Sequence, residues 1–191
     1  TKNTISDLNL MKENGIASKL VSMKGKIPIM GICGGYQMMG RFLSDPDGVE
    51  GTPSETEGLG LFEDTTSWKK GTDILRRVSG TILSGGGDVS GYETHAGTTD
   101  VKENPLFEIK MFKGDFNEGS VREDELLFGT YLHGVFESVD FRNYFLSFIE
   151  NAGEGSGTDY QESVDENIDR LADVFEEALD MDIIMKLTEA E

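Results

Sequence analysis

Apolar and polar residues follow a helical spacing in the first part of the 191-residue chain. Apolar residues three positions apart predict a first helix over 4–14, and Thr4 and Asp7 have the spacing of a capping box at its start. A second, shorter helical stretch ends at Gly25. The apolar run 27–32 that follows has the length of a buried strand, so the chain is expected to begin helix, helix, strand.

Farther along, the spacing becomes strand-like, and glycine-rich breaks separate the apolar runs. Residues 44–58 have no apolar periodicity and predict an exposed loop. Residues 84–88 contain three glycines and predict a hairpin connection rather than a phosphate-binding loop, because no lysine or helix start follows them. Strands are expected over 59–62, 74–83, 89–95, 106–112 and 126–132.

Helical spacing returns near the end of the chain. Asp140 is expected to cap a helix that is rich in phenylalanine. Residues 154–162 are polar and are interpreted as a linker. Ser163 and Glu166 have capping-box spacing at the start of an amphipathic helix that is expected over 163–187.

Composition and charge fit one domain over residues 1–191, with 37% apolar residues and a formal net charge of −19. Such a negative surface repels phosphate backbones and anionic lipid headgroups, which argues against nucleic acid and membrane partners. No apolar run approaches the ~18 residues that span a bilayer, and no basic and apolar leader opens the chain. A cytoplasmic location is therefore expected.

The single cysteine, Cys33, lies between a predicted strand and a predicted helix and is flanked by glycines. One cysteine excludes an intrachain disulfide and a metal site built on paired thiolates, and no metal site is expected. A lone cysteine could be a small core residue. The glycine-flanked turn instead favours a nucleophile elbow, in which a helix N-terminus lowers the thiol pKa and the N–H of Gly34 stabilises an oxyanion.

Two histidines are available as a general base. His133 follows the predicted strand 126–132 and precedes Gly134, at the kind of strand end where open α/β folds place their chemistry. It is the expected base. His95 is the rival, and it is interpreted as a strand histidine satisfied by a hydrogen bond, as a wall of the pocket or as an alternative base.

Three segments carry a family resemblance. Residues 31–37 (GICGGYQ) resemble the G-x-C-x-G-x-Q signature of class I glutamine amidotransferases. Residues 91–97 (GYETHAG) and 129–136 (GTYLHGVF), with the opening segment 1–4 (TKNT), are similar within that class to the C-terminal glutaminase domains of the cobyric acid synthase family, from cobalamin biosynthesis. The resemblance extends over about 1–187.

This resemblance implies a mechanism and a set of site residues. Cys33 would attack the side-chain amide of glutamine, Gly34 would hold the oxyanion, and His133 would protonate the leaving ammonia and then activate water. The residues expected to bind the substrate are Tyr36, Gln37, Tyr92, Glu93 and His95.

One position departs from the usual catalytic triad of the class. Class I enzymes commonly carry an acid two residues after the histidine, whereas this chain has Val135. The resemblance to the cobyric acid synthases implies a Cys and His pair without that acid. Glu93 and Glu137 are the alternatives for a carboxylate that orients His133.

The resemblance also implies a fold class, an α/β flavodoxin-like fold of three layers, with helices on both faces of a parallel or mixed sheet. Because the relatives have earlier strands, and a Pro-Gly pair before the Thr-Lys segment whose N–H resembles a second oxyanion donor, this chain is expected to lack its first strands and that donor. An uncovered strand edge is the expected result.

The implied function is the supply of ammonia to a synthetase domain that amidates corrin-ring carboxylates. ATP and Mg²⁺ would be cofactors of that N-terminal domain and not of this one, which has no G-x-x-x-x-G-K-[ST] motif. Two alternatives stay open: a glutaminase subunit that serves a cell-wall precursor, and a non-catalytic or redox-sensing module with the same elbow.

Overall fold

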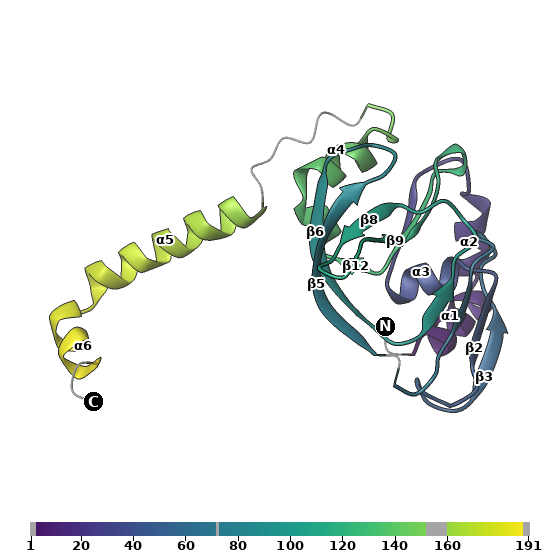
Figure 1. Ribbon diagram of the computed structural model, residues 1–191, viewed down its shortest axis with the longest axis horizontal. Helices are drawn as coiled ribbons and strands as arrows, with labels where there is room; N and C mark the ends of the chain where they lie inside the picture. The colour runs from purple at the N-terminus through teal and green to yellow at the C-terminus, as the bar shows by residue number, and fades with distance from the viewer. Residues whose placement is uncertain (1–2, 72, 152–159, 189–191) are drawn as a thin grey trace. The chain divides into compact units, whose positions relative to one another are not determined.

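The computed structural model describes residues 3–71, 73–151 and 160–188 and divides into two units, residues 1–155 and 156–191 (Figure 1). We describe each unit by itself. All the strands of the described residues belong to the first unit.

The first two predicted helices are confirmed as α1 (Thr4–Glu13) and α2 (Ile16–Ser22). The predicted capping box is wrong, because Asn3 occupies the N-cap and no side chain caps the helix. The hydroxyl of Thr4 instead donates to Glu50 at 3.0 Å and to Gln37 at 3.4 Å. The start of α1 is thus tied to two distant parts of the chain.

A three-stranded sheet holds the chain on both sides of the cysteine. Its order is β1 (Ile29–Ile32), β11 (Leu127–Thr130) and β10 (Ser120–Arg122), with β1 parallel to β11 and β10 antiparallel to it. Within the described residues β1 has a strand partner on one side only. The helix α3 (Gly34–Met39) follows β1 after a single residue.

An antiparallel five-stranded sheet carries most of the core. Its order is β12 (Leu132–His133), β6 (Asp88–His95), β5 (Ile74–Ile82), β8 (Phe107–Lys110) and β9 (Phe116–Glu118). The predicted hairpin over 84–88 is confirmed, since β5 and β6 pair directly across it and two of its glycines adopt positive φ. Val78, Val89 and Leu132 point from one face of this sheet into the core.

A third sheet corrects two expectations. Its order is β3 (Ser54–Glu57), β2 (Phe42–Asp45), β4 (Thr65–Ser67) and β7 (Thr98–Asp100). Residues 44–58, expected as an exposed loop, therefore include the second half of β2 and the whole of β3, whose polar residues gave no apolar period. The strand expected over 59–62 is wrong, because Leu61 and Phe62 donate their N–H groups to Met39 and pack around the end of α3.

One predicted strand is divided between two sheets. The run 126–132 forms β11 in the three-stranded sheet and, after Tyr131, enters β12 in the five-stranded sheet. The mixed α/β class with helices on both sides is confirmed, with α1 and α2 on one side of the first unit and a later helix, α4, on the other (Figure 1). The only parallel pairs among the described strands are β1 with β11 and β2 with β4.

The aromatic helix is confirmed as α4 (Val139–Leu146), but its cap is not Asp140. The hydroxyl of Ser138 accepts from the N–H of Phe141, while the carboxylate of Asp140 accepts from the N–H of Asp88. Short 3₁₀ helices cover Glu123–Glu125 and Val135–Glu137. The aromatic face of α4 packs on the core side of the five-stranded sheet.

The second unit is helical where it is described. The helix expected over 163–187 consists of α5 (Tyr160–Ala178), which begins before Ser163, and α6 (Met181–Thr188). Most of the predicted linker 154–162 lies outside the described residues. None of the helices that the structure describes has the length and apolar character to cross a membrane.

Candidate active site

Cys33 occupies a sharp turn between β1 and α3. Its φ of 54° and ψ of −117° are unusual for a residue with a side chain, and its N–H donates to the carbonyl of Thr130 at 2.8 Å. A Cβ at Gly31 would lie 2.5 Å from the sulfur of Met39 and 2.8 Å from the Cα of Tyr36, so only glycine allows α3 to fold back this closely. The strand, turn and helix of a nucleophile elbow are therefore present.

The surroundings of the thiol differ from the expectation. Burial raises the pKa of Cys33, and the N–H of Gly34, which lowers it, does not offset that effect. The lowered pKa expected from the sequence is wrong in direction, because burial of the thiol outweighs the effect of the N–H at the start of α3. The Cys33 sulfur lies 3.6 Å from the carbonyl oxygen of Thr94, at the end of β6.

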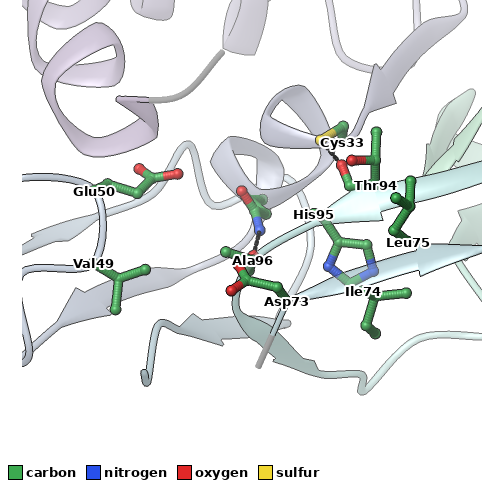
Figure 2. A pocket seen from close by; sticks show the side chains of 10 residues that line it. Cys33, Val49, Glu50, Asp73, Ile74, Leu75, Thr94, His95 and Ala96 are labelled. Atoms are coloured by element: carbon green, nitrogen blue, oxygen red, sulfur yellow. Dashed lines mark hydrogen bonds between the residues drawn. The ribbon is translucent and has the colours of Figure 1, made fainter. Parts of the chain in front are cut away.

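A cavity of about 450 Å³ opens beside Cys33, within the ~300–1,000 Å³ range of small-molecule sites. Figure 2 shows Cys33, Glu50 and His95 around it, brought there by the elbow, by the loop after β2 and by the end of β6. Its lining is Cys33, Gln37, Val49, Glu50, Asp73, Ile74, Leu75, Thr94, His95 and Ala96. Its two formally charged groups are both carboxylates.

Gln37 lines this cavity, as the resemblance implied for a substrate-binding residue. Its side chain is 3% exposed and is held at both ends. The amide nitrogen donates to the carbonyl of Ala96 at 3.0 Å and to the hydroxyl of Tyr131 at 3.2 Å, and Thr4 donates to the amide oxygen. Gln37 thus forms a fixed wall of the cavity.

Glu50 lines the cavity too, although it was not among the site residues expected from the sequence. Its carboxylate accepts from the backbone N–H of Thr4 at 2.6 Å and from the Thr4 hydroxyl at 3.0 Å. The carboxylate of Asp45 holds the loop by accepting from the N–H groups of Val49 and Glu50 at 2.8 and 2.9 Å. The turn-forming sequence Asp-Pro-Asp-Gly before Glu50 signalled only an ordered turn.

His95, one of the site residues predicted from the sequence, lies on the wall of the cavity. Its ring stacks on Tyr131, with ring centroids 3.7 Å apart and an angle of 15° between the planes. Burial lowers the pKa of His95, and the charge of Glu93 opposes this shift only in part. The Nδ1 atom is buried without a hydrogen-bond partner in the described residues. The lowered pKa favours the neutral form of the ring, which lines the cavity.

His133 lies near the cavity but does not line it. It pairs in register with Tyr92, and the two rings stack with centroids 5.1 Å apart. Its Nε2 atom is buried without a hydrogen-bond partner in the described part of the chain, and no hydrogen bond joins it there to Cys33. Both residues nevertheless lie along the same stretch of β6, Cys33 against Thr94 and His133 against Tyr92.

Three other predicted substrate-binding residues do not line the cavity. Tyr36 is 1% exposed, and its hydroxyl group hydrogen-bonds to Asp64 and Ser120 in the core. Glu93 is buried in an ion pair with Arg76. Tyr92 is half-exposed and stacks on His133. These side chains support the site from behind or beside it.

Neither alternative for an acid that orients His133 makes that contact. Glu93 pairs in register with Leu132, so it points to the opposite face of the sheet from His133. The carboxylate of Glu137 lies close to Gly134, and in the described residues no hydrogen bond joins it to His133. Among the described residues, no group of three or more His, Cys, Asp or Glu side chains could hold a metal ion.

Comparison with known proteins gives the family. Residues 1–141 match the CobB/CobQ-like glutamine amidotransferase domain. The chain belongs to this family. Cobyric acid synthases of Brucella canis and Brucella suis are 40% identical to it over 190 residues, and that of Brucella abortus is 39% identical. The aligned region covers 98% of the chain, and the chain spans 38% of the length of each of these curated relatives.

Membership of the CobB/CobQ-like glutamine amidotransferase domains confirms the resemblance stated for residues 31–37, 91–97 and 129–136. The elbow with Cys33, the cavity beside it and His133 all lie within the matched residues 1–141. The chain is thus a glutamine amidotransferase domain.

Proposed function

We propose that this domain hydrolyses glutamine to glutamate and ammonia, with Cys33 as nucleophile and His133 as general acid and base. The observation that carries the proposal is the strained elbow, which presents the Cys33 sulfur to a cavity of about 450 Å³ in a glutamine amidotransferase domain. An unusual backbone conformation persists where the surrounding structure enforces it, and such residues gather at functional sites.

The reaction proceeds in two halves. His133 takes the proton of the Cys33 thiol, the resulting thiolate adds to the amide carbon of glutamine, and the N–H of Gly34 donates to the oxyanion that forms. His133 gives a proton to the nitrogen as the C–N bond breaks, which releases ammonia and leaves a thioester. Water then adds to the thioester as His133 takes its proton, and the C–S bond breaks to yield glutamate and the free thiolate.

The charged and polar groups that line the cavity suit the α-ammonium group and the polar side chain of glutamine. Glu50 and Asp73 offer negative charge to the α-ammonium group. His95 and Gln37 supply the neutral polar walls, and in this proposal His95 binds the substrate and does not act as the base. The raised pKa of Cys33 makes activation by His133 necessary, because burial disfavours the free thiolate.

For the acceptor we propose the carboxylates of a corrin ring, in cobalamin biosynthesis. The support is the 40% identity to proteins named cobyric acid synthase, of whose length the chain spans 38%. A synthetase partner domain would bind ATP and Mg²⁺, activate the carboxylate and receive the ammonia, while the glutaminase domain itself needs no cofactor. The reaction would take place in the cytoplasm, where a reactive thiol stays reduced.

The test is ammonia release from glutamine by the complete natural protein, with and without ATP and a corrin acid. We expect one glutamate for each ammonia released, and amidation of the corrin acid when ATP is present. Absence of ammonia release under every condition would overturn the glutaminase function. Ammonia release without corrin amidation would overturn the acceptor and leave the glutaminase function standing.

A further inference from the structure

Two neighbouring segments change sheets side by side next to His133. The chain leaves β9 in the five-stranded sheet and enters β10 in the three-stranded sheet through Gly119. The chain also passes in the opposite direction from β11 to β12 through Tyr131. We call residues 130–132 the crossover. His133 is the first residue after it, so the geometry of the crossover contributes, with the pairing of His133 and Tyr92, to where His133 lies.

A buried carboxylate, that of Glu118, holds the crossover together. One of its oxygens accepts from the backbone N–H of Tyr131 at 2.7 Å, and the other accepts from the hydroxyl of Thr130 at 2.6 Å. The Thr130 hydroxyl in turn accepts from the N–H of Leu132 at 2.9 Å. Tyr131 belongs to neither strand, and Glu118 supplies the partner that a sheet ladder would otherwise give its N–H.

Burying the carboxylate of Glu118 costs free energy, because the charged group loses its contact with water. Packing alone does not explain why a carboxylate lies here. Glu118 is 6% exposed and Thr130 is fully buried. Burial raises the pKa of Glu118 to about 7, and the hydrogen bonds from Thr130 and from the N–H of Tyr131 offset this shift only in part. An apolar residue of the same size would avoid this penalty but would leave the N–H of Tyr131 unpaired.

The side chain of Tyr131 has separate anchors. Its hydroxyl accepts from the amide nitrogen of Gln37 and is hydrogen-bonded to the hydroxyl of Thr99, and its ring stacks on His95. These contacts fix the cavity wall without Glu118. What Glu118 and the Thr130 hydroxyl add to the strand pairing of β11 and β12 is a set of hydrogen bonds to the crossover itself, immediately before His133.

We propose that Glu118 is a positioning residue for the glutaminase reaction, whose carboxylate braces the crossover and so places His133 relative to Cys33. This inference rests on the proposed function, since it requires His133 to be the acid and base. A misplacement of a catalytic group by about 1 Å can cost on the order of a hundredfold in rate, so the brace is expected to affect kcat.

The decisive variants differ in the hydrogen-bonding groups that they keep beside the crossover. Glu118→Met keeps the length of the side chain but removes both acceptors, and it is expected to lower the glutaminase kcat by about 10- to 100-fold. The KM for glutamine should stay within about twofold. Glu118→Gln keeps one oxygen for the N–H of Tyr131 and an amide group for Thr130, and it should retain most of the activity. Glu108→Met is the matched control, because Glu108 pairs with Asn117 and points to the other face of the sheet.

Thr130 supplies a second pair in case Glu118→Met does not fold. Thr130→Val removes the hydroxyl with little change in shape and should lower kcat, whereas Thr130→Ser keeps the hydroxyl and should not. A double variant with His133→Ala tests the route of the effect, because a residue that acts through His133 adds no further loss once His133 is absent.

The outcomes separate the two proposals. If the wild-type protein releases no ammonia from glutamine, the proposed function fails. If the wild-type protein is active and His133→Ala is not, but Glu118→Met or Thr130→Val matches the wild type, the positioning role is overturned. The same conclusion follows if the losses of Glu118→Met and His133→Ala multiply, or if Thr130→Ser and Thr130→Val are equally impaired.

Discussion

The elbow that carries Cys33 and the crossover that carries His133 are built in different ways. The elbow is mainly local, because the glycine of β1, the cysteine and the first turn of α3 lie within 31–37 and Gly31 allows their close packing. One distant hydrogen bond, from the N–H of Cys33 to the carbonyl of Thr130, adds to it. The crossover depends on distant groups. Glu118 holds its backbone from 12 to 13 residues away, and Tyr92 supports the His133 ring from another strand.

This difference predicts different responses to change. A local turn tolerates changes elsewhere, whereas a catalytic group placed by long-range hydrogen bonds moves when any of its supports is removed. Cys33 already faces the cavity, whereas no hydrogen bond joins His133 to Cys33 within the described residues. The placement of His133 is therefore the more sensitive half of the site.

The largest expected effect comes from the elbow. Cys33→Ser should reduce glutamine-dependent amidation by at least ~1,000-fold, because the nucleophile of the first half-reaction is lost. Amidation from added ammonium salts should persist, since it bypasses that half-reaction. Both rates are measured on the complete natural protein. Full use of glutamine by the serine variant would show that Cys33 is not the nucleophile.

Next in size is the contrast between the two histidines. His133→Ala should lower the glutaminase kcat by about a hundredfold or more, as expected for a general acid and base. His95→Ala should instead raise the KM for glutamine by about tenfold, because His95 lines the cavity as a neutral ring. Steady-state kinetics on both variants decides the roles. The reverse pattern would exchange them.

A smaller effect is expected at the charged wall. Glu50→Gln should lower kcat/KM for glutamine by about tenfold, through loss of the charge that faces the α-ammonium group. It should leave kcat/KM for glutaramate, which has no α-amino group, almost unchanged. Glu55→Gln, on the exposed side of β3, is the control. Equal losses for both substrates would mean that Glu50 supports the structure of the site and does not meet the α-ammonium group.

The contrast between features fixed by nearby residues and features fixed by distant residues also explains what could be predicted from the sequence. The turn at Cys33, the hairpin after β5 and the strand-end position of His133 were predictable from glycine and apolar spacing. Glu50 was not, because its place in the cavity depends on Thr4, 46 residues away. The strand expected over 59–62 was wrong since burial around α3 gives the same apolar run as a strand.

The hydrogen bonds of Glu118 to the crossover should also be visible in the stability of the protein, apart from any effect on its activity. The pKa of Glu118 is about 7 in the folded protein, against an ordinary value of 4.5. A raised pKa means that the folded state binds the proton more tightly, so its contribution to stability is fully present below about pH 4.5 and is lost as the pH rises through about 7.

Glu118→Gln removes this titration while keeping the shape of the side chain. The free energy of unfolding of the wild type, relative to that of Glu118→Gln, should therefore be lower at pH 8 than at pH 5, by a few kcal/mol at most. Urea unfolding at the two pH values measures it, and Glu108→Gln should show the wild-type dependence. A relative stability that does not change with pH would mean that burial beside the crossover does not disfavour the ionised form of Glu118.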